Sequence, residues 1–326
     1  DALGVVFEGL RNTLDPRVLL ALSSASKGLR APMLALSSAS HGLRAPMQAL
    51  LQQLRADYEV AAGMCRKAGL RSCKELREAT EVSWRNKGLS TADWAMLGTL
   101  GSVLPALERL RLGGGAAGPH GMQRLAAGLG AGALPALTWL VIDGVRVSDT
   151  GASALAAALG RGAMPRLEIL GLICCFIGDA GLVALAPALR RLPELQELTF
   201  SGNPFGDEGL AALVAPPPLP AGALSPTAGV LTKLKMLTLH STQVNDAGCA
   251  ALASSLRLYH EGIPMLPGLS RGCFKRGQHR QKYNLWLGGI PASDAAVSDV
   301  FEALLDRRAG DEAESRRRRE VDRDSE

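Results

Sequence analysis

Aromatic residues and long apolar runs are both scarce in this 326-residue sequence. Aromatics make up 4% of the chain although apolar residues make up 47%, so the apolar mass is mostly leucine and alanine. This composition favours many thin, similar layers over one core built around large rings. No run of about 18 uncharged apolar residues occurs, and we therefore expect no membrane span. The length allows one elongated domain or two compact ones.

Paired cysteine motifs are also missing. The six cysteines share no C-x-x-C spacing and have no matching histidine pairs; they are Cys65, Cys73, Cys174, Cys175, Cys249 and Cys273. We interpret them as small buried hydrophobic residues in a reducing compartment, with zinc or disulfide sites as the alternatives. The adjacent Cys174 and Cys175 should point to opposite faces of a strand. This use of cysteine predicts a cytoplasmic protein and no metal site.

None of the common catalytic signatures is present. The sequence lacks a G-x-x-x-x-G-K-[ST] phosphate loop, an H-E-x-x-H zinc motif and a G-x-S-x-G nucleophile elbow. Its five histidines are scattered, and no cysteine–histidine nucleophile pair is visible. Residues 104–256 carry ten basic and ten acidic side chains, whereas a nucleic-acid interface needs clustered Lys and Arg. The sequence therefore predicts a protein that is not an enzyme and argues against nucleic acid as its partner.

One segment has the glycine spacing of a dinucleotide-binding fingerprint. In LERLRLGGGAAGPHGMQRLAAGL, residues 107–129, Gly113, Gly115 and Gly118 spell G-x-G-x-x-G between a strand-like run and a helix-like run. Asp143 stands further along, at the end of a second apolar run, where a ribose-binding carboxylate is expected. However, LEILGLICCFIGDAG and LQELTFSGNPFGDEG occupy the same slot without these glycines. We therefore interpret the glycines as part of a repeat turn and expect no cofactor.

The stronger pattern is an internal repeat of 28 to 30 residues. Sets of spaced leucines begin at Leu107, Leu137, Leu167, Leu195 and Leu234, and the last interval is lengthened by an insertion. Each set follows L-x-x-L-x-L-x-x-(N/C)-x-L-x-x-x-G-x-x-x-L-x-x-x-L with substitutions. Its first part predicts a short strand with one buried face, and its second part predicts an amphipathic helix. Neither element buries its apolar face alone, so neighbouring repeats must stack.

Polar positions within the repeat also carry information. An aspartate stands two residues before the repeat's glycine at Asp149, Asp179, Asp207 and Asp246, near predicted helix starts where a carboxylate can cap free N–H groups. The Asn/Cys position holds Cys175 and Asn203, but it holds Gly115, Val145 and Thr242 in other repeats. We therefore expect incomplete hydrogen bonding along that edge. Segments 79–97 and 285–304 fit degenerate repeats that cap the two ends.

These repeats resemble the leucine-rich repeat family, in particular its long-repeat subfamily of ribonuclease inhibitor, over residues 76–304. The resemblance implies an α/β fold: a right-handed βα horseshoe solenoid with a parallel sheet on the concave face and helices outside. It also implies that a protein partner binds the concave face, where side chains between the buried leucines project outward. The candidate binding residues are Arg85, Arg109, Arg111, Trp139, Val141, Glu197, Thr199, Lys235, Met236, Thr238, His240 and Trp286. We favour Arg109, Arg111 and Trp139, because Arg and Trp dominate binding hot spots.

The N-terminal segment shows a tandem duplication and a second resemblance. Residues 21–34 recur as 35–48 with two differences, and Pro32 and Pro46 should interrupt any single helix. Without the second copy, residues 1–33 resemble an F-box, with an apolar helix start, an Asp-Pro turn and L-x-x-L-S-x-x-S-K-x-x-R. This implies docking to the Skp-type adaptor of cullin–RING ubiquitin ligases through Leu3, Val6, Phe7, Leu10, Pro16, Leu19 and Leu22. A helical cap for the repeat stack is the alternative.

We divide the chain into four parts. A small all-helical F-box-like segment (1–50) and a helical connector (51–75) precede the repeats (76–306), which have insertions at 215–229 and 257–282. A charged tail (307–326) follows, with few apolar side chains, and we expect it to be disordered. Its Arg316–Arg319 run offers a nuclear signal as an alternative to a plain solvated charge run. Because the sequence begins at Asp1 rather than methionine, we also expect further residues before it.

Three functions remain open at this point. The chain is an F-box substrate receptor of a ubiquitin ligase, a free-standing leucine-rich-repeat binder or inhibitor, or an activator of a Ran-type small GTPase. All three use the repeats to hold a protein, and they differ in whether the N-terminal segment has a partner of its own. Repeat architecture sets the shape of the binding surface and leaves its chemistry nearly free, so the identity of the partner stays undetermined.

Overall fold

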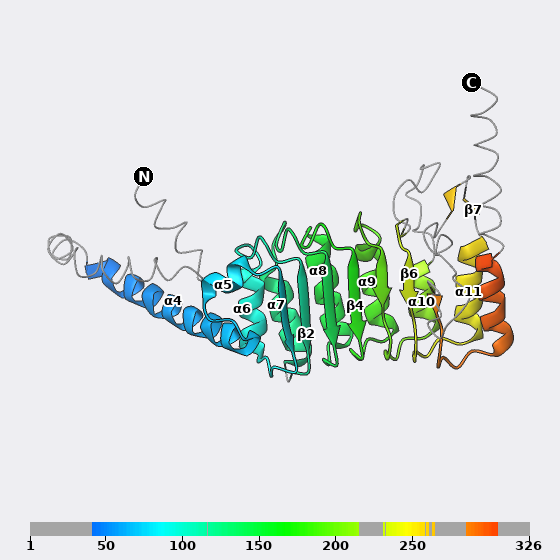
Figure 1. The fold of residues 1–326 in the computed structure, drawn as a ribbon, viewed down its shortest axis with the longest axis horizontal. Coiled ribbons are helices and arrows are strands. Elements are labelled where there is room, and N and C mark those ends of the chain that lie inside the picture. The colour runs from blue at the N-terminus through cyan, green and yellow to red at the C-terminus, as the bar shows by residue number, and fades with distance from the viewer. Residues whose placement is uncertain are drawn as a thin grey trace, which may run out of the picture.

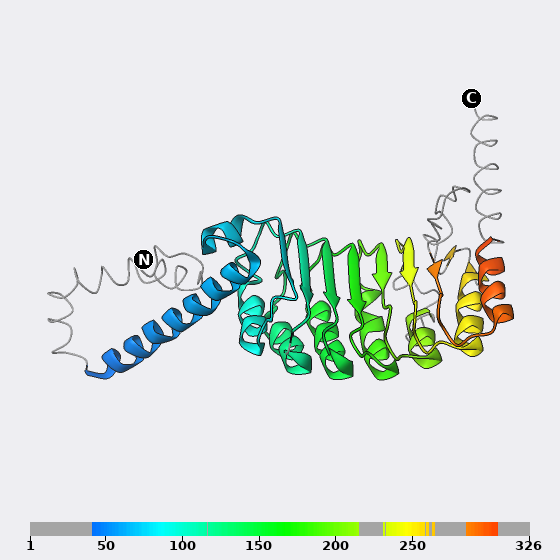
Figure 2. The same ribbon diagram turned by 60° about the horizontal axis from the view of Figure 1, so that its bottom comes forward.

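A computed structural model shows the chain as an elongated stack of strand–helix units (Figure 1). The structure describes residues 41–115, 117–214, 231, 233–257, 259–260, 263–264 and 285–305. Within these residues one parallel sheet runs in the order β1-β2-β3-β4-β5-β6-β9, and the helices line one side of it (Figure 2). The α/β repeat solenoid with a parallel sheet is thus confirmed. The F-box-like segment as far as residue 40, both insertions for the most part, and the charged tail lie outside the described residues.

Each predicted repeat contributes one strand and one helix. The strands are β1 (Glu81–Arg85), β2 (Arg109–Gly113), β3 (Trp139–Asp143), β4 (Ile169–Ile173), β5 (Glu197–Thr199), β6 (Met236–Thr238) and β9 (Leu285–Trp286). The helices are α6 (Thr91–Leu100), α7 (Gly118–Gly128), α8 (Ser148–Gly160), α9 (Asp179–Leu189), α10 (Asp207–Val214) and α11 (Asp246–Arg257), followed by a helix over 294–305. A short antiparallel pair, β7 (Tyr259–His260) and β8 (Ile263–Pro264), forms a separate sheet.

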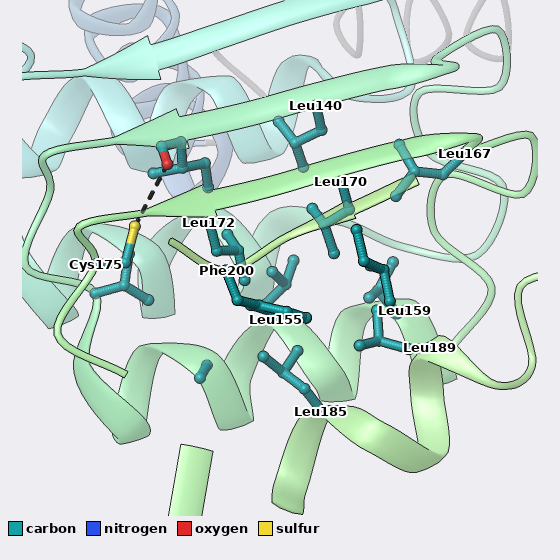
Figure 3. Close-up of a cluster of buried hydrophobic side chains, with 14 of the residues drawn as sticks. Leu140, Leu155, Leu159, Leu167, Leu170, Leu172, Cys175, Leu185, Leu189 and Phe200 are labelled. Atoms are coloured by element: carbon teal, nitrogen blue, oxygen red, sulfur yellow. Dashed lines mark hydrogen bonds between the residues drawn. The ribbon is translucent and has the colours of Figure 1, made fainter. Parts of the chain in front are cut away.

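The core is a continuous layer of leucines between the sheet and the helices. Strand pairing places the second leucine of each repeat opposite its counterpart in the next, as in Leu140 opposite Leu170. These strand leucines point toward helix leucines such as Leu155 and Leu185 (Figure 3). All four side chains are at most 2% exposed. The burial of one strand face and one helix stripe in every repeat therefore forms a single core along the stack.

The repeat aspartates bind the repeat that follows their own. Asp179, the first residue of α9, accepts hydrogen bonds at Oδ1 from the N–H groups of Gly206 (2.8 Å) and Gly209 (2.7 Å). Equivalent bonds join Asp149, Asp207 and Asp246 to the repeats after them. The sequence predicted carboxylate caps near the helix starts, and the structure shows that the capped N–H groups belong to the next repeat. Such charge-assisted bonds are roughly twice as strong as neutral ones.

This contact explains the repeat glycine at three positions, Gly181, Gly209 and Gly248. A Cβ at Gly209 would lie 2.8 Å from Asp179 Oδ1, and a Cβ at Gly181 would lie 2.5 Å from Asp149 Oδ1. Real Cβ atoms do not approach an oxygen so closely, so any other residue would push the carboxylate off its N–H partners. The aspartate of one repeat and the glycine of the next therefore work as one contact.

Hydrogen bonding at the Asn/Cys position is incomplete, as expected. Asn203 accepts from the N–H groups of Cys175 (3.0 Å) and Ile177 (3.1 Å), and its Nδ2 donates to Leu172 O and Phe200 O (both 2.7 Å). By contrast, the Thr242 hydroxyl donates to Leu239 O, which belongs to its own repeat (3.0 Å). Gly115 and Val145 have no polar side chain to contribute. The best-bonded edge is thus at the centre of the stack.

Two helices cover the N-terminal end of the sheet. Helix α4 (His41–Ala68) packs against α6 and β1, and α5 (Cys73–Glu78) follows it. The expectation that Pro46 interrupts any helix here is wrong, because α4 runs through Pro46 and past residue 50 without a break. Pro46 is the sixth of its 28 residues, so the missing N–H removes one hydrogen bond near the helix start.

Specific polar contacts hold α4 to the first repeat. The indole N–H of Trp84, in β1, donates to Met64 O at 2.9 Å inside the core. Lys67 Nζ lies 2.6 Å from Asp93 Oδ2, and Asp93 also forms a capping box with Ser90 at the start of α6. Burial would raise the pKa of Asp93, but the hydrogen bonds from Lys67 and Ser90 outweigh it and hold that pKa below its ordinary value. Helices α4 and α5 therefore close this end of the stack.

The cysteines within the described residues are free thiols. Cys174 is exposed and Cys175 is buried, but both follow β4 and Cys174 has a φ of 51°, so the expectation that they point to opposite faces of a strand is wrong. Cys65 and Cys73 are buried side by side at the N-terminal end, with their Sγ atoms 3.8 Å apart. None of the helices that the structure describes is both long and apolar enough to cross a membrane.

Replacing Asp179 with alanine should destabilise the stack. The change removes the acceptor of two N–H groups in the next repeat, and we expect the free energy of unfolding to fall by about 3 kcal/mol. Urea unfolding followed by circular dichroism measures this loss. Glu208→Ala is the matched control, since Glu208 is an exposed carboxylate in the first turn of the next helix, and it should cost less than about 1 kcal/mol. Equal losses in the two variants would contradict the role assigned to Asp179.

Candidate functional site

The face of the sheet opposite the helices is named here the open face (Figure 2). Because side chains alternate along a strand, every second residue points to this face, and the parallel register aligns these residues in rows. The first row is Glu81, Arg109, Trp139, Ile169, Glu197 and Met236. The second row is Ser83, Arg111, Val141, Gly171, Thr199, Thr238 and Trp286.

The structure places all twelve sequence-predicted binding residues in or beside the strands of this sheet. Arg85, Arg109, Arg111, Trp139 and Val141 lie on the neighbouring strands β1 to β3, and Lys235 and His240 flank β6. The predicted residues do not form one cluster, since β2 and β6 are four strands apart, or about 19 Å. The adaptor-binding candidates Leu3, Val6, Phe7, Leu10, Pro16, Leu19 and Leu22 lie outside the described residues.

Arg111 stacks on Trp139. The guanidinium carbon of Arg111 lies 5.8 Å from the centre of the indole ring, within the range of a cation–π interaction. Its Nε atom is enclosed, and no residue that the structure describes accepts a hydrogen bond from it. Both side chains are half-buried. The stack thus holds a positive charge at a defined place on the open face.

Arg85 and Asp143 pair across an intervening strand. Their Nη2 and Oδ2 atoms are 2.6 Å apart, although β2 lies between β1 and β3. The pair passes over Gly113, where a Cβ would lie 2.7 Å from Asp143 O and 3.2 Å from Arg85 Cγ. Gly115 is restricted similarly, since a Cβ there would lie 3.0 Å from Leu89 O. Packing between repeats therefore accounts for these glycines. The Asp143 carboxylate, which the fingerprint would use to bind a ribose, is instead paired with Arg85.

An apolar patch beside the stack was predicted only in part. It consists of Val141 on β3, which was among the predicted binding residues, and of Ile169 and Ile173 on β4, which were not. Val141 is only 6% exposed although it faces away from the core, because it packs over Gly171, where a Cβ would lie 2.9 Å from Val141 Cγ2. The signal was present in LEILGLI, since the repeat pattern puts the residues between its leucines on the open face.

The C-terminal part of the open face is more polar. Glu197, Thr199 and Thr238 are half-buried, and Trp286 is 41% exposed on the last strand. Trp286 also lines a hollow of about 760 Å³ between β9 and the helix over 294–305. This hollow is the end of the leucine core, where no described strand follows β9.

The chemistry of the open face suits noncovalent binding. It combines guanidinium groups, an indole ring and an aliphatic patch, and beside β6 the Ser241 hydroxyl lies in hydrogen-bonding contact with Nδ1 of the exposed His240 ring. Among the residues that the structure describes, no group of three or more His, Cys, Asp or Glu side chains could hold a metal ion.

The comparison with protein families agrees with the repeat architecture. The family described as Leucine Rich repeat matches residues 192–214, which include Asn203. No curated protein matches the chain. Among solved structures, it is similar to an internalin from Listeria monocytogenes, at 13% identity and a TM-score of 0.23, covering 75% of this chain and 93% of that one.

These findings support a leucine-rich repeat protein. The strand–helix unit recurs along the sheet, the leucines of each unit fill one shared core, and the matched segment contains Asn203, which bonds to the backbone of the preceding repeat and of its own. Proteins built from such repeats are generally scaffolds for protein interactions. At the coarse level the chain is therefore an α/β repeat solenoid that contains a leucine-rich repeat.

Gly113→Ala should disturb the open face without opening the core. The added methyl group meets the Asp143 carbonyl, so we expect a loss of about 1–3 kcal/mol in the free energy of unfolding. Gly130→Ala is the control, because no atom lies within 4 Å of a Cβ there, and its effect should stay within about 0.5 kcal/mol. Thermal unfolding measures both. A neutral Gly113→Ala would argue against packing as the reason for the glycine.

Proposed function

We propose that the chain binds a protein partner on its open face, and that this face is the concave side of a ribonuclease-inhibitor-like horseshoe. The observation that carries the proposal is the Arg111–Trp139 stack beside the Val141–Ile169–Ile173 patch, on a sheet face that the helices leave uncovered. The repeat length of 28 to 30 residues supports the subfamily.

The composition of this surface matches the centre of a protein interface. Interface cores are enriched in Trp and Arg and depleted in Lys, Asp and Glu, with a polar rim around them. Here Trp139, Arg111 and the two isoleucines form the centre, and the paired charges Arg85–Asp143 and Arg109–Glu81 lie toward the N-terminal side. Since the four central side chains are already half-buried and in register, little ordering entropy opposes binding.

Ile169→Arg tests the use of the open face. A long cation at the centre of the apolar patch should reduce partner recovery about tenfold or more, because the partner would have to desolvate it. Affinity purification of the full chain with quantitative mass spectrometry measures the recovery.

The matched control is Val183→Arg, on the outer surface of α9, where Val183 is 39% exposed. It should leave partner recovery unchanged. Circular dichroism of both variants confirms that they fold. If Ile169→Arg recovers the same proteins in the same amounts as the unaltered chain, the open face is not the binding site.

We further propose that residues 1–50 act as an F-box, so that the chain is a substrate receptor of a cullin–RING ubiquitin ligase in the cytoplasm. The support is the sequence pattern from Leu3 to Arg30. Helices α4 and α5 already close the N-terminal end of the stack through Trp84 and Lys67, so the segment before residue 41 is not needed as the cap.

A pull-down with the purified Skp-type adaptor tests this second role. The full chain should retain the adaptor, and a chain without residues 1–40 should lose it while keeping helix α4 and the open face. Partner recovery through the open face should be the same for both. Failure of the full chain to bind the adaptor would leave a free-standing binder.

A further inference from the structure

Arg111 differs from the other arginines of the open face. Arg85 has Asp143 at 2.6 Å, and Arg109 has Glu81 at 3.7 Å. Among the described residues, no carboxylate pairs with Arg111, and no acceptor bonds to its enclosed Nε. One positive charge on this face is therefore left without a counter-ion.

The stack on Trp139 prepares this charge for a ligand. A guanidinium held against a ring at 5.8 Å has lost most of its freedom before a ligand arrives, so less entropy is lost on binding. With Nε enclosed, the Nη groups are the donors that remain for a ligand. Two parallel N–H groups in one plane match the two oxygens of a carboxylate.

The charge balance favours a monoanion. Asp143 and Glu81 already offset Arg85 and Arg109, so a single uncompensated positive charge remains next to Trp139. A phosphate dianion would lie near two carboxylates with one free guanidinium to neutralise it. An Asp or Glu side chain of a partner carries the single charge that fits.

The apolar patch next to Arg111 determines which side chain of the partner binds beside the partner's carboxylate. Arg111 is on β2, and Ile169 and Ile173 are on β4, two strands further, which corresponds to about 10 Å. An extended peptide advances about 3.3 Å per residue, so about three residues span this distance.

We propose that this part of the open face recognises an acidic–apolar peptide segment of the partner. An Asp or Glu carboxylate binds Arg111, and an aliphatic or aromatic side chain about three residues away packs on Val141, Ile169 and Ile173. This inference rests on the proposed function, because it names the ligand chemistry of the same face.

The experiment selects ligands from a display library of random linear peptides on the immobilised full chain. We expect an acidic residue about three positions from Leu, Ile or Phe to be enriched in the selected peptides. The Arg111→Gln variant should no longer select the acidic position. A selected peptide is then synthesised with its Glu or Asp and with the corresponding amide, and both affinities are measured by fluorescence anisotropy.

We expect the amide peptide to bind the unaltered chain about tenfold more weakly, and Arg111→Gln to remove this difference. Arg146→Gln is the matched control, since Arg146 stacks on Phe176 at 5.4 Å in a loop outside the strands. It should keep the tenfold difference. Circular dichroism checks that each variant folds.

The outcomes separate this inference from the proposed function. Peptides that lose binding with Ile169→Arg but show no acidic preference would overturn the acidic–apolar segment and leave the open face as a binding site. An acidic preference that persists in Arg111→Gln would also overturn it. Peptides that bind equally well to Ile169→Arg would overturn the open face itself.

Discussion

The contact between an aspartate and the backbone of the following repeat is the constraint on which the stack depends. A strand pair of two to five residues offers few hydrogen bonds, and the leucine layer is the same from one repeat to the next, so neither sets the spacing alone. Asp149, Asp179, Asp207 and Asp246 each reach two donors of the next repeat, and the glycine that faces each of the first three leaves no room for any other arrangement. The carboxylates thereby position successive helices, and with them the strands.

The open face follows from this regular spacing. Once the strands are aligned, residues one repeat apart lie side by side. A glycine then leaves room for the side chains of neighbouring strands. Gly113 lets Arg85 reach Asp143, and Gly171 lets the Val141 side chain pack closely over the backbone of β4. These two glycines lie on either side of the Arg111–Trp139 stack. Because Asp143 pairs with Arg85, Arg111 is left without a carboxylate partner among the described residues.

Much of this fold could be predicted from the sequence, because each repeat states the same pattern independently. Leu107, Leu137 and Leu167 open sets with identical spacing, and the strands and helices lie where that spacing puts them. The course of α4 could not be predicted. Proline usually interrupts a helix, but here Pro46 removes only one hydrogen bond from a helix of 28 residues. The apolar patch was within reach of the pattern, whereas the pairing of Asp143 was not, since it links strands that are not neighbours.

By itself, then, the sequence determined the repeat unit, the parallel sheet and the residues that line its open face, because these depend on the short-range periods of strand and helix. Only the tertiary structure decided which charges are neutralised and which remain available. Arg85, Arg109 and Arg111 are alike in the sequence, since each stands next to a buried residue of its strand. Their difference arises from side chains on other strands, and such contacts depend on distances across the sheet that no local pattern contains.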